Sequence, residues 1–332
     1  MTHPVVDYTP PTDSLLRNPR LDHAVEVPLL GVPLRFETNS VYVRDLVEDT
    51  FGAWRALPRG SVSPDRALRV TVQITGGDEG TSSDPLPALR YICYDDARYI
   101  IHTPGSVAMI DPDRGEASAY VTADLASRRT LFRHSVLEAI GLSLVAHHDR
   151  HPIHASAVGR GDRVVMFAGA SGSGKSTLAY MAHSAGLDVL TEDALWVQLH
   201  PALRFWGWAR HIHLKPEAVR FFPELAGRSV RDTDASGKIV VDIEREAQSF
   251  EKSNATVCVI ERGAGSPELE RLSRSDLFRI LTDQLTQGYD RYPERLDSTV
   301  AAVAADGGWK LRLTDDPREA LPLLLDLVEA NP

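Results

Sequence analysis

The segment 169–176 has the residue types and spacing of a phosphate-binding loop. It reads Gly-Ala-Ser-Gly-Ser-Gly-Lys-Ser and fits the pattern G-x-x-x-x-G-K-S. Glycines adopt positive φ angles easily and let backbone N–H groups close around phosphate oxygens. Lys175 can reach the outer phosphates, and the Ser176 hydroxyl can ligate Mg²⁺. The predicted nucleotide-binding residues are Gly169, Ala170, Ser171, Gly172, Ser173, Gly174, Lys175, Ser176 and Thr177.

The elements on either side of this segment must position it. An apolar run at 163–168 predicts a strand, and 175–185 predicts a helix. Such a helix presents its positive dipole end to the bound phosphates. A glycine-rich turn with a chance lysine needs neither element, so we favour the phosphate-binding interpretation. The segment therefore predicts binding of ATP together with Mg²⁺.

Two acids and a histidine turn nucleotide binding into a hypothesis about a reaction. Glu192 and Asp193 end an apolar strand-like run, seventeen and eighteen residues after Lys175. We expect both beside the loop, because α/β sheets hold ligands at the carboxyl ends of their strands. One acid can order Mg²⁺, and the other can accept a proton from an attacking hydroxyl. His154, fifteen residues before Gly169, can orient a carboxylate.

This arrangement of His154, the 169–176 loop and the acidic pair resembles the catalytic domain of HPr kinase/phosphorylase and its kinase-like relatives. The resemblance covers about 150–262 and implies an α/β P-loop kinase domain of the HPr kinase / phosphoenolpyruvate carboxykinase type. It implies that Lys175 holds the β- and γ-phosphates and that Ser176 and Asp193 hold Mg²⁺. Glu192 would be the base that activates a serine hydroxyl, supported by Asp193 and His154.

The chain departs from this family in two respects. The family usually has aspartate where this chain has Glu192, which puts the reverse, phosphate-removing reaction in doubt. An HPr-docking sequence is not evident, so HPr is not the predicted substrate. The chain is more similar to stand-alone relatives that phosphorylate other hydroxyls. Because relatives are often oligomeric, the resemblance also implies a homo-oligomer.

A basic stretch after two tryptophans is a candidate substrate site. Arg210, His211 and Lys215, with His213 between them, could contact an anionic group or the acceptor. The alternative is a solvated strand face with Trp206 and its neighbours in the core, because exposed charged faces are common. The sequence leaves both interpretations open.

Other residues of these types are interpreted as structural. Lys238 precedes an apolar strand, where lysine is ordinary. A metal site at His147, His148, His151 and His154 is disfavoured, because no cysteine or carboxylate has the matching spacing for zinc.

Composition bounds the classes of partner and compartment. The chain has 332 residues and a formal net charge of -10, which disfavours a broad nucleic-acid surface. Cys93 and Cys258 are the two cysteines, so no disulfide framework is expected. The sequence begins without a signal-peptide pattern, and no apolar stretch is long enough to span a bilayer. We therefore expect a cytoplasmic protein without a membrane or nucleic-acid partner.

The pattern of apolar residues predicts two domains after a loose, Pro-rich arm at 1–22. Residues 23–148 predict an α+β domain that takes part in recognising the acceptor. It is expected to contain a hairpin or two short strands at 25–36 and further strands at 68–75, 90–94, 99–103 and 106–111, mostly antiparallel. Helices are expected at 41–57 and 131–147. Residues 149–332 predict the P-loop kinase domain, with a strand at 153–159 ahead of the loop strand.

The functional hypothesis is an Mg²⁺-dependent kinase that moves the γ-phosphoryl group of ATP to a hydroxyl, in the first instance a serine of a peptide or protein. The first alternative is a kinase of a small-molecule hydroxyl, such as a sugar, an amino acid or an antibiotic. The second is a nucleotide-gated binding module without catalysis. The acidic pair disfavours the binding module, because a pure switch needs no second acid as base.

Overall fold

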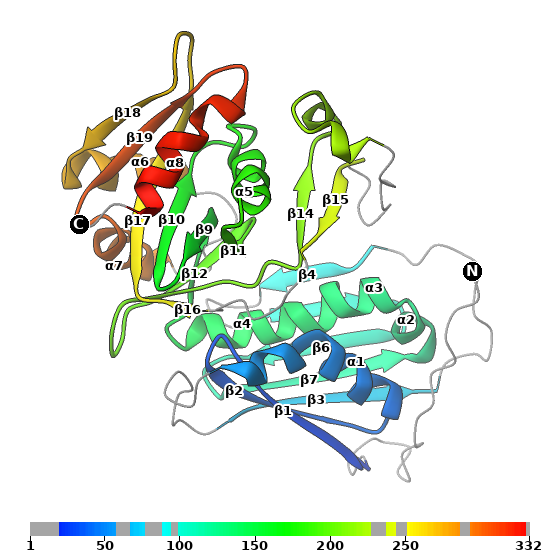
Figure 1. Ribbon diagram of the computed structural model, residues 1–332. Coiled ribbons are helices and arrows are strands. Elements are labelled where there is room, and N and C mark those ends of the chain that lie inside the picture. Colours follow the sequence, from blue (N-terminus) through cyan, green and yellow to red (C-terminus); the bar gives the residue numbers. More distant parts are fainter. Residues whose placement is uncertain are drawn as a thin grey trace. The chain divides into compact units, whose positions relative to one another are not determined.

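The computed structural model (Figure 1) divides into two compact units, Met1–His148 and Asp149–Pro332, which are considered separately. Of the predicted arm at 1–22, only the last three residues lie within the described part of the chain. The structure describes residues 20–57, 67–76, 88–93, 99–226, 237–243, 251–285 and 293–329.

The first unit is built on a seven-stranded sheet with the order β1-β2-β3-β7-β6-β5-β4. β3 pairs in parallel with both β2 and β7, and the other neighbours are antiparallel. Sequence analysis predicted six of these strands and missed β7. The bounds are β1 (His23–Leu29), β2 (Val32–Thr38), β3 (Leu68–Thr75), β4 (Arg90–Cys93), β5 (Tyr99–Thr103), β6 (Ser106–Asp111) and β7 (Glu116–Thr122).

Helices cover one face of this sheet (Figure 1). The predicted helix at 131–147 is interrupted, because a π-helical stretch at Arg133–Glu138 separates two α-helices. A Cβ on Gly141 would lie 3.0 Å from Leu29 Cδ2, so this helix approaches the sheet closely. The helices are α1 (Val41–Phe51), followed by a 3₁₀ turn at Gly52–Ala56, α2 (Ala123–Ser127), α3 (Arg129–Phe132) and α4 (Ala139–His147).

The second unit has a six-stranded mixed sheet with the order β11-β9-β10-β17-β19-β18. The central strands β10, β17 and β19 run in parallel, and the outer pairs are antiparallel. The bounds are β9 (Ser156–Arg160), β10 (Arg163–Ala168), β11 (Asp188–Thr191), β17 (Asn254–Arg262), β18 (Glu268–Leu272) and β19 (Gly308–Leu313).

Both faces of the central strand β10 are buried, which explains its continuous apolar run. Val165 and Phe167 belong to one apolar cluster, which includes residues of α5 and α8. Val164 and Met166 belong to the other, which includes residues of α6 and α7. The helices are α5 (Lys175–Ser184), α6 (Arg274–Leu285), α7 (Pro293–Val303) and α8 (Leu321–Glu329), the last preceded by a 3₁₀ turn at Pro317–Ala320.

Two smaller sheets complete the second unit. One has the order β16-β13-β12-β8, and the other is the two-stranded hairpin β14–β15. Between the hairpin strands lie 3₁₀ turns at Pro216–Arg220 and Pro223–Leu225. The bounds are β8 (His151–His154), β12 (Ala194–Gln198), β13 (Arg204–Trp206), β14 (His211–Leu214), β15 (Ile239–Asp242) and β16 (Glu251–Lys252).

The single strand predicted at 153–159 is wrong, because the chain changes sheets at Ala155. β8 pairs with β12, whereas β9 pairs with β10 and β11. The Ala155 N–H donates to the Asp193 carbonyl at 3.0 Å, and His154 lies opposite Ala194. The change of sheet therefore brings His154 beside the bend between β11 and β12, where the acidic pair lies.

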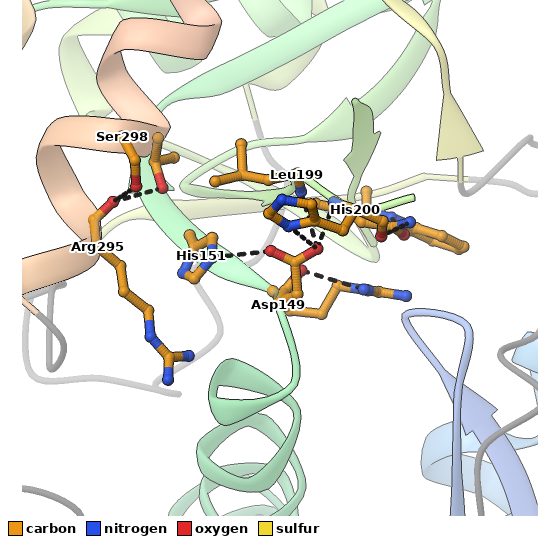
Figure 2. Close-up of polar contacts among 10 residues, drawn as sticks. Asp149, His151, Leu199, His200, Arg295 and Ser298 are labelled. Atoms are coloured by element: carbon orange, nitrogen blue, oxygen red, sulfur yellow. Dashed lines mark hydrogen bonds and ion pairs between the residues drawn. The ribbon is translucent and has the colours of Figure 1, made fainter. Parts of the chain in front are cut away.

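Asp149 fastens the start of the second unit to the segment after β12 (Figure 2). Its carboxylate accepts from the N–H groups of Leu199, at 3.0 Å, and His200, at 2.6 Å. His151 Nε2 lies 3.1 Å from the other carboxylate oxygen. Burial alone would raise the pKa of Asp149, but His151 and the two N–H groups outweigh it and hold the pKa below its ordinary value. We call these four residues the Asp149 cluster.

Candidate functional site

The predicted strand, glycine-rich loop and helix are confirmed as β10, residues 169–174 and α5. Gly169, Gly172 and Gly174 have φ angles of 154°, 83° and 115°, a backbone conformation that residues with a side chain rarely adopt. A Cβ on Gly169 would also lie 3.0 Å from the Ile260 carbonyl oxygen on the neighbouring strand. The loop glycines are therefore required by backbone conformation and, at Gly169, by close packing.

Lys175 begins α5 and turns back into the loop. Its side chain is buried, and Nζ donates to the carbonyl oxygens of Gly169, at 2.7 Å, and Ala170, at 3.2 Å. Burial lowers the pKa of Lys175, and the charges of Asp193 and Glu192 partly oppose that shift. A phosphate in the loop would replace the two carbonyls as the partner of this ammonium group.

The two acids have different partners. Ser176 Oγ donates to Glu192 Oε1 at 2.5 Å, and His213 Nδ1 lies 3.2 Å from Glu192 Oε2. Asp193 Oδ1 lies 3.1 Å from His154 Nδ1. The Glu192 side chain is 12% exposed and the Asp193 side chain 54%. Glu192 is thus held inside the site, and Asp193 projects toward solvent.

A cavity of about 680 Å³ lies over the loop and the acids, between residues that are far apart in the sequence. Its size is that of a small-molecule site. The sequence-predicted residues that line it are His154, Ser171, Gly172, Gly174, Lys175, Ser176, Thr177, Glu192, Asp193 and Lys215.

Five predicted residues do not line this cavity. Gly169 and the Ser173 hydroxyl are buried on the inner side of the loop, whereas Ala170 is exposed and turns only its carbonyl oxygen toward Lys175 Nζ. The Arg210 guanidinium lies 4.3 Å from the centroid of the Trp208 ring, and His211 Nδ1 lies 2.8 Å from Asp242 Oδ1. The structure therefore does not bring Arg210 and His211 to the cavity.

Sequence reasoning missed several residues of the cavity wall. Lys238, interpreted as an ordinary lysine before a strand, lines the cavity. Arg262 does so as well, and one signal could have found it. It ends an apolar strand, and the carboxyl ends of neighbouring parallel strands meet at one edge of a sheet. The other missed residues are Leu214, Glu217, Ala218, Arg220 and Phe221, and His213 was noted only as part of the basic stretch.

The oxygen donors at this site fit a magnesium ion. Within the described residues, no group of three or more His, Cys, Asp or Glu side chains is placed to hold a metal. Mg²⁺ at phosphoryl-transfer sites needs only one or two protein oxygens, with phosphates and water as the other ligands. The Ser176 hydroxyl and the Glu192 carboxylate supply such oxygens. Sequence analysis expected Asp193 in the place that Glu192 occupies beside Ser176.

The histidines between 147 and 154 each contact a different acid or ring. His147 Nε2 lies 3.2 Å from Asp113 Oδ1, and the rings of His147 and His148 are in edge contact. His151 contacts Asp149, and His154 contacts Asp193.

Within the described residues, no helix combines the length and the apolar character that crossing a membrane requires. Neither a protein-family model nor a curated protein matches this chain.

Proposed function

We propose that this protein is an ATP- and Mg²⁺-dependent kinase that transfers the γ-phosphoryl group to a hydroxyl, in the first instance a serine of a peptide or protein. We assign the second unit to the P-loop kinase domains of the HPr kinase / phosphoenolpyruvate carboxykinase type. One observation carries the proposal. A histidine from β8, the glycine-rich loop after β10 and the two carboxylates between β11 and β12 line the same cavity.

The donor side of the reaction uses the loop and its first helical turn. Loop N–H groups and the N-terminus of α5 bind phosphate oxygens, and Lys175 exchanges its two carbonyl partners for them. Ser176 and Glu192 would hold Mg²⁺, which neutralises charge on the β- and γ-phosphates. Catalysis of this kind is mainly positioning and charge stabilisation.

The geometry favours a division of roles between the acids that is the reverse of the one implied by the resemblance. Both carboxylate oxygens of Glu192 are engaged, one by Ser176 and the other by His213. Asp193 is more exposed and is oriented by His154. We therefore propose that the Asp193 carboxylate accepts the proton of the attacking hydroxyl and that His154 positions Asp193.

The proposal is tested by incubating the protein with γ-labelled ATP and Mg²⁺ in the presence of either a serine-peptide library or a pool of hydroxylated metabolites. We expect label in the peptide fraction with the wild-type protein and none with Lys175→Ala. Label in the metabolite pool alone would identify a small-molecule kinase. Tight ATP binding without turnover in either pool would contradict the kinase and favour a nucleotide-gated binding module.

A further inference from the structure

Basic side chains of the second unit differ in whether they have partners. Those away from the cavity usually pair with an acid or a carbonyl, as Arg160, Arg204, Lys252, Lys310, Arg312 and Arg318 do. Lys215, Lys238 and Arg262 line the cavity instead. Within the part of the chain that the structure describes, these three have no hydrogen bond or ion pair. We call them the basic cluster.

The two lysines face each other at the end of a hairpin. The register of β14 and β15 runs from His211 opposite Asp242 to Leu214 opposite Ile239. Lys215 directly follows β14 and Lys238 directly precedes β15, so they are the next residues beyond the last register pair. Like charges directly opposite each other destabilise such a pair. An anion bound between them would remove this repulsion, so their placement points to a negatively charged ligand.

The basic cluster also approaches the phosphate-binding loop at two places. A Cβ on Gly172 would lie 3.6 Å from Lys215 Nζ, and a Cβ on Gly174 would lie 3.4 Å from Arg262 Nη2. Lys215 comes from the β14 hairpin, whereas Arg262 ends β17, the parallel neighbour of the loop strand. The two cations therefore reach the loop from separate elements, on the side that faces the cavity.

We propose that Lys215, Lys238 and Arg262 bind the β- and γ-phosphates of the nucleotide, opposite the loop amides and Lys175. The closeness of Lys215 to Gly172 and of Arg262 to Gly174 places these two cations on the phosphates rather than on a distant part of the acceptor. Lys238 joins them because it lies opposite Lys215 in the continued register of β14 and β15 and lines the same cavity. A local cluster is needed because the chain has a net charge of -10, which repels a polyanion at long range. The inference rests on the nucleotide binding within the proposed function and does not depend on phosphoryl transfer.

The test compares the binding of Mg·ATP, Mg·ADP and AMP to the full-length protein by titration calorimetry. We expect the affinity for Mg·ATP to fall about tenfold in each of three variants, which corresponds to the loss of one charge-assisted contact. These variants are Lys215→Met, Lys238→Met and Arg262→Met. The affinity for Mg·ADP should fall less, and the affinity for AMP should not change. Lys310→Met is the matched control, because it removes a cation that pairs with Glu270 outside the cavity.

A second measurement separates ligand binding from a structural role. The ligand-free Lys238→Met variant should melt at the same temperature as the wild type or higher, because the repulsion between the lysines is gone. Its ATP-induced rise in melting temperature should be smaller. A lower melting temperature without ligand, with an unchanged ATP-induced rise, would assign Lys238 a structural role and overturn the proposal for it.

Three further outcomes are decisive. Unchanged ATP affinity in all three variants would overturn the inference. An equal loss for ATP and AMP would also overturn it, since the contacts would then not be to the outer phosphates. Cluster-dependent ATP binding by a protein that transfers no phosphoryl group would support this inference and contradict the kinase proposal, so the two can fail separately.

Discussion

The Asp149 cluster and the cavity over the phosphate-binding loop are both charged regions of the second unit, and they differ in how their charges are satisfied. The Asp149 carboxylate has partners at both oxygens, His151 on one and the N–H groups of Leu199 and His200 on the other (Figure 2). In the cavity, Lys175 Nζ donates to two carbonyl oxygens of its own loop. The basic cluster has neither a hydrogen bond nor an ion pair within the described residues.

We attribute this difference to function: the Asp149 cluster stabilises the fold, and we propose that the cations at the cavity bind an anionic ligand. Lys215 and Arg262 are exposed and Lys238 is half-buried, so water can solvate them, but their convergence on one cavity concentrates positive charge there. A set of cations left open at one cavity, beside a loop with positive φ angles, is then best explained by an anion that binds there. Substitutions in the two regions should accordingly change different quantities.

The largest effect should come from Lys175→Ala. We expect phosphoryl transfer to fall about a thousandfold or more, because the main cation at the outer phosphates is lost. Transfer of label from γ-labelled ATP measures the effect, and denaturant unfolding should show a folded protein. Transfer within tenfold of the wild-type rate would remove Lys175 from its proposed role.

The acidic pair should give the next largest effect. Asp193→Asn should lower the maximal rate about a hundredfold while Mg·ATP still binds, because a general base contributes on that scale. Glu192→Gln should instead raise the Mg²⁺ concentration that half-saturates the protein. Full loss of rate in Glu192→Gln at saturating Mg²⁺, with an active Asp193→Asn variant, would restore the roles implied by the resemblance.

Asp149→Asn should act on stability instead of on nucleotide binding. Loss of the charge that accepts two N–H groups and faces His151 should lower the free energy of unfolding by about 2 kcal/mol. Asparagine tolerates the positive φ of 55° at this position, so backbone strain should not contribute. Urea unfolding checks the loss, and an unchanged ATP affinity checks the separation of the two regions.

The smallest effect is a pH dependence of that stability. The pKa of Asp149 is held below its ordinary value in the folded protein, so folding releases a proton near acid pH. The stabilisation is complete above the unfolded pKa, near pH 4, and is lost as pH falls through the folded pKa. The free energy of unfolding of the wild-type protein should therefore fall more than that of Asp149→Asn between pH 5 and pH 3, as measured by urea unfolding. If the free energy of unfolding changed with pH in parallel for the wild type and Asp149→Asn, the charge of Asp149 would contribute nothing to stability.

Local patterns predicted the elements whose burial is regular. The strands at 68–75 and 163–168 were predicted to the residue, from alternation in β3 and from a continuous apolar run in β10. The helix after the loop ends one residue earlier than expected. Elements were missed or merged where the signal is not periodic. The sheet change at Ala155 leaves no mark in the apolar pattern, because the apolar residues on both sides of it, Ile153 and Ala157, are buried.

The site was predictable to the extent that its residues lie in one local motif. The loop, Lys175 and Ser176 follow from spacing alone, and the acidic pair lies one helix and one strand further on. The placements of Arg210 and His211 did not follow, because His211 pairs with Asp242 across a hairpin and Arg210 packs on Trp208. Neither contact has a signal within a short window of sequence.

The sequence by itself determined the conformation of the glycine-rich loop at 169–174, because glycine spacing, a buried strand and a helix start set the backbone over a few consecutive residues. Only the tertiary structure decided that Glu192 contacts Ser176 and that Lys238 and Arg262 face the same cavity. Those contacts depend on strand pairing between segments far apart in the chain. Local conformational preference carries no information about that pairing, which is set by the packing of the whole unit.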